Sequence, residues 1–327
     1  MTTTSHARPP NRPGRNAAPV LRCIGNTSML ELTRIVPEDC ARILLKIECE
    51  NPTGSMKDRM ALAMIEAGER AGRLRPGSRL VEYTGGSTGV SLALICAARG
   101  YPLDIVTSDA FSGEKRDHMA ALGAELTIIR SDAGGMNEAL TRAMIDAARE
   151  IANRTGAYWT DQLNNAGQLP AYHVMGDEIW DQTGGRIDAF VQSTGTSASL
   201  RGNGEALRSH KPDILLVAVE AEESAVLSGG PPGVHKIEGV GPGFVPALWR
   251  PALVDHITTV STADAMAMAR RLARTEALFA GTSTGANVAA AIDLGRHLGP
   301  DATVVTVMCD SGMKYLSMPL YRHNRAA

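Results

Sequence analysis

The sequence predicts an α/β fold built on mostly parallel, doubly wound sheets. Short apolar runs alternate with amphipathic stretches at helical spacing along most of the 327 residues, which is the pattern of consecutive β-α-β units. The apolar runs do not alternate with polar residues, so helices should cover both faces of each sheet. At about 150 residues per domain, the length suggests two domains.

The individual elements follow from these runs in chain order. Seven runs are predicted as strands: residues 43–47, 80–83, 103–106, 126–129, 189–192, 214–219 and 303–308. Eight stretches are predicted as helices: residues 57–71, 90–98, 114–122, 136–153, 171–182, 199–209, 262–274 and 284–298. Ser55 and Asp58 provide a start signal for the first helix. The Pro- and Gly-rich stretch 228–246 is too long for a passive connection, which predicts a functional loop.

The charge balance argues against two classes of partner. Lys and Arg total 33 and Asp and Glu total 35, which gives a net charge of −2. A nucleic-acid-binding domain usually carries a basic patch, and only 4% of the residues are aromatic, too few for base stacking. A membrane surface would attract a polybasic segment, and no apolar run approaches the roughly 20 residues of a membrane span.

Cysteine usage and the two ends of the chain bear on the compartment. The five cysteines are odd in number and form no CxxC, which predicts free thiols in a reducing compartment, the cytoplasm. Residues 1–18 are predicted to be a disordered tail, and they lack the apolar stretch of a secretory signal. Their arginines and lack of acidic residues leave an organelle transit peptide as an alternative. Residues 321–327 are predicted to be a second tail.

Four glycine-rich loops adjoin predicted strands or helices, at residues 52–57, 84–89, 195–199 and 281–285. Backbone amides at helix N-termini bind anions, so four such loops predict a ligand with phosphate or carboxylate groups. The alternative is that they are ordinary turns between strands and helices.

Several common motifs are missing. The sequence contains no GxxxxGK[ST], HExxH or GxSxG, which argues against a phosphate-loop nucleotide site, a zinc protease site and a hydrolase nucleophile. The GVGPG at 239–243 resembles a dinucleotide fingerprint only loosely, because it contains proline and no helical pattern follows it. No Cys/His spacing indicates a metal, and the eight scattered histidines are interpreted as surface or packing residues.

Lys57 is unusual because it stands at the start of a predicted helix. The positive end of the helix dipole disfavours a cation there, so this amine should lose its proton more easily than an ordinary lysine. Such an amine is suited to attack a carbonyl group and form a Schiff base. The alternative is an exposed lysine stabilised by Asp58.

Seven ordered blocks of sequence carry a family resemblance: IGNT at 24–27, NPTGSMKDR at 51–59, EYTGGSTG at 82–89, GTSAS at 195–199, HKIEGVGPGF at 235–244, GTSTGA at 281–286 and DSG at 310–312. With these blocks, the chain resembles the cysteine synthase / cystathionine β-synthase family of fold-type-II enzymes that use pyridoxal 5'-phosphate (PLP). The resemblance runs from about residue 24 to residue 316.

The resemblance implies a tryptophan synthase β-like fold with two doubly wound domains. A small mobile domain that grips the substrate would span residues 45–154, and a large PLP-binding domain would combine residues 19–44 and 155–320. A homodimer is implied as well, and the resemblance admits a serine acetyltransferase as a partner.

The resemblance also implies the site residues, with Lys57 as the Schiff-base lysine. The implied cofactor-binding residues are Lys57, Ser87, Gly195, Thr196, Ser197, Ala198, Ser199 and Ser311. The implied substrate-binding residues are Thr84, Gly85, Gly86, Ser87, Thr88, Gln162 and Gly239. Ser311 would face the pyridine nitrogen, where a neutral hydroxyl makes a weaker electron sink than a carboxylate and favours loss of a β-substituent.

The implied reaction is β-replacement on an O-activated serine such as O-acetylserine. Lys57 would act as general base on the α-proton, and sulfide or a related sulfur or nitrogen nucleophile would add to an aminoacrylate intermediate. The alternatives are β-elimination, as in serine or threonine dehydratases, and cystathionine β-synthase-type activity. A non-enzymatic binding or regulatory protein is a further alternative, which the presence of Lys57 and Ser311 argues against.

Departures from the family pattern concern the substrate. TGGST stands at 84–88 in place of the usual TSGNT. Gly85 lacks a hydroxyl, which should widen the site or weaken its grip, and Ser87 is shorter than Asn and would reach the cofactor through a water. Ser197 and Ala198 replace two glycines of the phosphate loop. These changes predict a donor or nucleophile other than the plain pair of O-acetylserine and sulfide.

Overall fold

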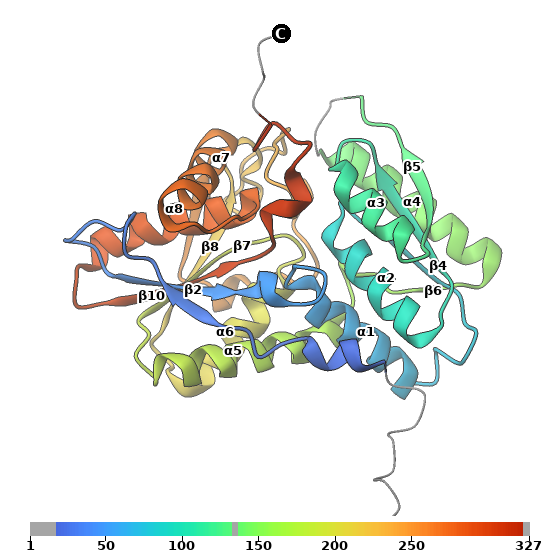
Figure 1. Ribbon diagram of the computed structural model, residues 1–327, viewed down its shortest axis with the longest axis horizontal. Coiled ribbons are helices and arrows are strands. Elements are labelled where there is room, and N and C mark those ends of the chain that lie inside the picture. The colour runs from blue at the N-terminus through green and yellow to red at the C-terminus, as the bar shows by residue number, and fades with distance from the viewer. Residues whose placement is uncertain (1–17, 133–136, 323–327) are drawn as a thin grey trace, which may run out of the picture.

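The computed structural model describes residues 18–132 and 137–322, and the chain there folds around two sheets (Figure 1). The larger sheet contains six strands in the order β1-β2-β10-β7-β8-β9. Their bounds are Met29–Glu31, Arg42–Ile47, Thr303–Met308, Ala189–Ser193, Leu215–Ala221 and His256–Val260 in that order. The pair β1–β2 is antiparallel and the other pairs are parallel. Although β10 comes late in the chain, it lies between β2 and β7.

The smaller sheet contains four strands in the order β5-β4-β3-β6, and every neighbouring pair is parallel. The bounds in that order are Glu125–Ile129, Leu103–Ser108, Leu80–Tyr83 and Tyr158–Trp159. The mostly parallel α/β architecture predicted from the sequence is therefore confirmed.

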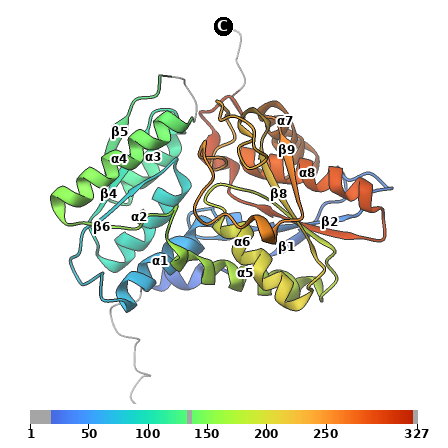
Figure 2. The same ribbon diagram turned by 180° about the vertical axis from the view of Figure 1, so that it is seen from behind.

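Helices cover both faces of the two sheets. They are α1 (Lys57–Arg70), α2 (Ser87–Arg99), α3 (Gly113–Ala121), α4 (Glu138–Thr155), α5 (Leu169–Thr183), α6 (Ala198–His210), α7 (Thr262–Arg271) and α8 (Thr282–Leu298). In the smaller sheet, α2 and α3 lie on one face and α4 on the other (Figure 1, Figure 2). Within the described ranges, no helix is both long enough and apolar enough to cross a bilayer.

The central strands are fully buried because helices pack on both sides. Every residue of β3, β4, β7 and β10 is buried. This explains why apolar residues predominate in these strands, although Glu82, Asp104 and Gln192 are buried with them. Phe190 and Val305, on neighbouring strands, have no exposed surface. Burying an apolar side chain of this size contributes about 1.5–3 kcal/mol to the free energy of unfolding.

The strands that the sequence does not predict lie at sheet edges. β1, β6 and β9 contain three, two and five residues, and they are partly exposed, so no continuous apolar run marks them. The predicted helix at 136–153 corresponds to α4, and residue 136 lies outside the described residues.

The division of the chain into two domains stays a prediction, and the sheets bear on its boundaries. Residue 45 lies within β2, which belongs to the larger sheet, whereas β6 at 158–159 pairs with β3 of the smaller sheet. The predicted tail at 1–18 lies outside the described residues except for Ala18. The predicted tail at 321–327 begins within the packed body, because the Tyr321 hydroxyl donates to the Ala280 carbonyl at 2.6 Å.

Candidate active site

A cavity lies where the carboxyl ends of both parallel sheets meet. β3 ends at Tyr83, β7 at Ser193 and β10 at Met308, and the residues at or just after these ends line the cavity. Open parallel sheets bind ligands in this position, beyond the carboxyl ends of their strands. The predicted functional loop contributes Glu238, Gly239, Val240 and Pro242 to the lining.

Lys57 is the first residue of α1 and lines the cavity. No hydrogen bond or ion pair to its Nζ is found in the part of the chain that the structure describes. Burial lowers the pKa of Lys57 below the usual 10.5, although Cys309 and Asp310 oppose this change. The chain therefore offers an unpartnered amine that releases its proton more readily than a surface lysine.

The start of α1 is fixed by the two residues that follow Lys57. Asp58 is buried and accepts hydrogen bonds from the Thr53 amide at 2.8 Å and the Thr53 hydroxyl at 2.5 Å. Asp58 thereby ties the loop before the helix to its first turn. The sequence predicted Asp58 as part of a helix-start signal with Ser55, but its partner in the structure is Thr53.

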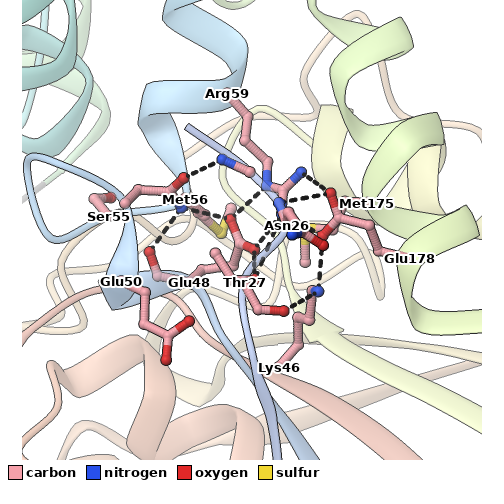
Figure 3. Close-up of polar contacts among 12 residues, drawn as sticks. Asn26, Thr27, Lys46, Glu48, Glu50, Ser55, Met56, Arg59, Met175 and Glu178 are labelled. Atoms are coloured by element: carbon pink, nitrogen blue, oxygen red, sulfur yellow. Dashed lines mark hydrogen bonds and ion pairs between the residues drawn. The ribbon is translucent and has the colours of Figure 1, made fainter. Parts of the chain in front are cut away.

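A buried charge cluster behind α1 consists of Lys46, Glu48, Arg59 and Glu178. Figure 3 shows Arg59 between the two carboxylates. Its Nε and Nη2 donate to Glu48 at 2.7 and 2.8 Å, and its Nη1 and Nη2 donate to Glu178 at 2.8 and 2.7 Å. Lys46 pairs with Glu178 at 2.7 Å. These residues come from β2, α1, α5 and the 3-10 turn after β2. The cluster therefore connects the first turn of α1, which contains Lys57, to the larger sheet.

The N-terminus of α6 forms a cradle of the kind that binds anions. Ser197 precedes the helix with a left-handed φ of 66°, and its buried Oγ has no hydrogen-bond partner. The backbone is tightly packed there, since a Cβ on Gly195 would lie 2.3 Å from the Gly239 carbonyl oxygen. An unpartnered hydroxyl beside a helix N-terminus fits a phosphate group.

The loop 84–88 lines the same cavity as the cradle, and hydrogen bonds to its own side chains hold it in place. The Thr84 hydroxyl accepts from the amides of Gly86 and Gly89 at 2.9 and 3.3 Å. Thr88 donates to the Gln162 side chain at 2.8 Å. The hydroxyls and amides of this loop line the cavity together with Gln162, which suits a carboxylate.

Two expectations about this loop change in the structure. A Cβ on Gly85 would lie 3.0 Å from the ring of Phe111, which is buried, so packing of Phe111 fills the space that the missing side chain leaves. Ser87 does not point freely into the cavity, because its hydroxyl donates to Asp310 at 3.0 Å. Gly85 therefore allows close packing of a neighbouring loop, and Ser87 joins the two sides of the cavity.

The cavity brings together most of the predicted site residues. Lys57, Gln162, Gly239, all five residues 84–88 and Gly195, Thr196, Ser197 and Ser199 line it. Ala198 does not, and its amide donates to the Thr196 hydroxyl at 3.3 Å.

The structure places Ser311 outside the cavity lining, so its predicted role stays a prediction. Ser311 is absent from the cavity lining, and its hydroxyl accepts from the Met313 amide at 3.2 Å as the cap of a short 3-10 helix. Ser283, in the first turn of α8, is a buried hydroxyl that does line the cavity. Both lie in motifs that the sequence identifies, but local spacing does not reveal which of the two serines lines the cavity.

Three further cavity residues are not among the predicted site residues, although Glu238 lies in the predicted functional loop. Lys115, Glu238 and Tyr315 are all buried and line the cavity. Lys115 Nζ donates to Glu238 at 2.5 Å and to the Tyr315 hydroxyl at 3.0 Å. These residues lie up to 200 positions apart, so no local pattern connects them.

The family follows from a comparison with known proteins. A family model described as pyridoxal-phosphate dependent enzyme matches residues 20–310. The chain belongs to this family. It is therefore a PLP-dependent enzyme, as the resemblance implied.

Several known proteins are similar to this enzyme in sequence and in fold. A cysteine synthase from Staphylococcus aureus is 41% identical over 305 residues, which cover 92% of this chain and 96% of the relative. The structure of an O-ureido-L-serine synthase superposes with a TM-score of 0.88 at 34% identity and covers 94% of this chain and 96% of that one. A cysteine synthase from Entamoeba histolytica gives a TM-score of 0.86 at 33% identity, with coverages of 100% and 96%.

The residues of the cavity fit PLP. The cofactor needs an amine for its aldehyde and a site for its phosphate, and the cavity offers the unpartnered Lys57 amine and the unpartnered Ser197 hydroxyl at the N-terminus of α6. Buried polar atoms without a partner are rare in folded proteins, so the Ser197 hydroxyl supports the fit.

Proposed function

We propose that the enzyme replaces the β-substituent of an O-activated L-serine, such as O-acetylserine, with a sulfur or nitrogen nucleophile. The observation that carries this proposal is the unpartnered amine of Lys57 in a cavity bounded by the anion cradle on one side and the hydroxyl-rich loop 84–88 on the other. Two relatives named cysteine synthase and one named O-ureido-L-serine synthase support it, because these names denote products with a new group on the β-carbon of serine.

The proposal assigns each side of the cavity a role toward the cofactor. Lys57 would carry the cofactor. The phosphate group of PLP would accept hydrogen bonds from the cradle, which is formed by Gly195, Thr196, Ser197, Ala198 and Ser199. We assign the neutral hydroxyl facing the ring to Ser283, because Ser283 lines the cavity and Ser311 does not. Bound PLP supplies an electron sink that acidifies the α-proton of an amino acid and allows a β-substituent to leave.

The chain's own residues perform the remaining tasks. Thr84, Ser87 and Thr88, with the loop amides and Gln162, would bind the carboxylate of the amino acid, and Gly239 would border it. Lys57 would accept the α-proton at Nζ, since burial lowers its pKa and favours the neutral amine. The leaving acetate would take the electron pair of the Cβ–O bond, the nucleophile would form the new bond to Cβ and lose a proton, and Lys57 would return a proton to Cα.

The same proposal covers compartment, assembly and domains. The five cysteines are free thiols, which fits the reducing cytoplasm. A homodimer, a mobile smaller domain and a serine acetyltransferase that supplies O-acetylserine remain parts of the proposal. Sedimentation of the purified protein tests the dimer, for which a single monomeric species is the contrary result.

Borohydride reduction of the holoenzyme, followed by peptide mass spectrometry, tests the role of Lys57. We expect the reduced cofactor to be attached to Lys57, and attachment elsewhere contradicts the assignment. Turnover is then measured with O-acetylserine as donor and sulfide as nucleophile. Release of pyruvate and ammonia without a new bond to Cβ would favour the elimination reaction and reject β-replacement.

A further inference from the structure

A buried ion pair crosses the cavity and has no part in the mechanism above. Lys115 belongs to α3, beside the smaller sheet, and Glu238 to the loop that follows the larger sheet's β8. The two are 2% and 8% exposed, and both line the cavity. The stem of Lys115 lies across the loop 84–88, because a Cβ on Gly86 would meet its Cδ at 2.2 Å. The pair is therefore next to the proposed carboxylate-binding loop.

Glu238 uses one of its two carboxylate oxygens. Oε2 accepts from Lys115 at 2.5 Å, whereas Oε1 is buried and has no hydrogen-bond partner in the protein. The Glu238 amide donates to Thr282 at 3.1 Å, which fixes the residue on the cavity wall. Leaving a buried acceptor unpaired costs about 1–3 kcal/mol, so Oε1 would gain from a hydrogen-bond donor on a ligand in the cavity that Glu238 lines.

Lys115 has one donor left over. An ammonium group has three N–H donors, and two of them go to Glu238 and the Tyr315 hydroxyl. Tyr315 itself donates to Asp310 at 2.8 Å, so its oxygen is free to accept from Lys115. Across residues 18–132 and 137–322, no third hydrogen bond of this ammonium is found. The pair thus presents an unused acceptor and an unused N–H donor on adjacent side chains.

We propose that Lys115 and Glu238 form the recognition subsite for the second substrate, and that this substrate carries a carboxamide or ureido group. Such a group places a carbonyl acceptor beside an N–H donor, which complements the donor on Lys115 and the acceptor on Glu238. The inference rests on the proposed β-replacement and specifies its nucleophile. Recognition by a neutral group fits the pair, because its two charges already compensate each other.

The pair discriminates against two other kinds of nucleophile. Hydrosulfide is an anion without an N–H group next to a carbonyl, and it would gain nothing from the free carboxylate oxygen. A cationic amine would meet the ammonium of Lys115 as well as Glu238. A site built to hydrogen-bond its substrate rejects analogues that leave its buried groups unpaired.

Hydroxyurea and sulfide, each offered with saturating O-acetylserine, test the inference. After acetate has left with the electron pair of the Cβ–O bond, the hydroxyl oxygen of hydroxyurea would form the bond to Cβ and lose its proton. In Glu238→Gln, the amide oxygen still accepts from Lys115, and the NH2 group replaces the free acceptor. We expect the ratio of kcat/KM for hydroxyurea to that for sulfide to fall at least ten-fold. Glu150→Gln, the same change at an exposed position of α4, should leave the ratio unchanged.

Urea provides a test on the unaltered enzyme, independent of whether a variant folds. It carries the ureido group but no nucleophilic oxygen, and we expect it to inhibit competitively against the nucleophile and not against O-acetylserine. Turnover of sulfide with no inhibition by urea, or an unchanged ratio in Glu238→Gln, overturns the subsite and leaves the proposed function standing. Absence of turnover with every nucleophile rejects the proposed function itself.

Discussion

Two groups of polar side chains, one including Arg59 and the other Lys57, involve the first turn of α1, and they differ in how many of their polar atoms have hydrogen-bond partners. In the charge cluster of Lys46, Glu48, Arg59 and Glu178, every buried polar side-chain atom has a partner. In the cavity, Lys57 Nζ, Glu238 Oε1 and Ser197 Oγ have none. Glu48, Arg59, Glu238 and Ser197 are all buried, so exposure of these four side chains does not explain the difference.

The difference distinguishes structural charges from functional ones. Desolvating a charge is expensive, and a complete set of partners compensates for it, so the cluster behind α1 can serve as a rigid support. In the cavity, the desolvation cost of the atoms without partners stays uncompensated until ligands bind. Substitutions in the two groups should therefore separate stability from activity.

Lys57→Ala should have the largest effect on activity and a small one on stability. Removing the amine removes the attachment point of the cofactor and the general base, so turnover should fall by about 10³-fold or more. The measurement is kcat with O-acetylserine and sulfide, together with the thermal midpoint. Lys236→Ala, at an exposed position, is the control, and activity retained in Lys57→Ala would refute the role of Lys57.

Arg59→Leu should have the largest effect on stability. It leaves Glu48 and Glu178 buried without their main partner, which should lower the free energy of unfolding by about 3–5 kcal/mol. Urea unfolding measures this change. Arg70→Leu is the matched control, because Arg70 is 68% exposed and its ion pair with Glu66 is 3.8 Å long. Equal losses in the two variants would show that the cluster is not a special support.

Lys314→Met should stabilise the protein at neutral pH. Lys314 is 5% exposed, its Nζ has no partner, and burial lowers its pKa to about 8. Since the unfolded chain holds this proton up to about pH 10.5, the native protein with lysine gains stability as pH rises from 8 to 10.5. The variant should be more stable by about 1–3 kcal/mol below pH 8, with an advantage that shrinks toward pH 10.5. Urea unfolding at pH 7 and pH 10 gives the comparison, and a pH-independent difference would contradict it.

Ser197→Ala should have the smallest effect. Its hydroxyl has no partner in the protein, so the thermal midpoint of the cofactor-free protein should stay the same while PLP binds about three- to ten-fold more weakly. Ser199→Ala offers the contrast, because the Ser199 hydroxyl bonds to Gln192 at 2.8 and 3.0 Å and its loss should lower that midpoint. Unchanged PLP affinity in Ser197→Ala would remove Ser197 from the cradle.

The sequence predicts the strands that are buried on both faces of a sheet and the loops whose glycines are close together. The buried runs at 80–83 and 303–308 are strands with these bounds, and Lys57 begins a helix as expected. These features depend on a few neighbouring residues, and local sequence carries that information.

The rest depends on contacts between distant segments. Whether Ser283 or Ser311 lines the cavity depends on how α8 and the turn after β10 pack, and the Ser311 hydroxyl accepts from the Met313 amide instead. The space beside Gly85 is filled by Phe111, 26 positions further on. Lys115 and Glu238 are separated by 123 positions, so their pairing exists only in the folded chain.

The place of β10 between β2 and β7 has a consequence for synthesis on the ribosome. The strands of the smaller sheet all lie within residues 80–159 and can pair while the nascent chain is still growing. The larger sheet stays divided into two separate halves until residues 303–308 have left the exit tunnel. Its exposed strand edges at β2 and β7 are therefore where a chaperone that shields nascent chains is most needed.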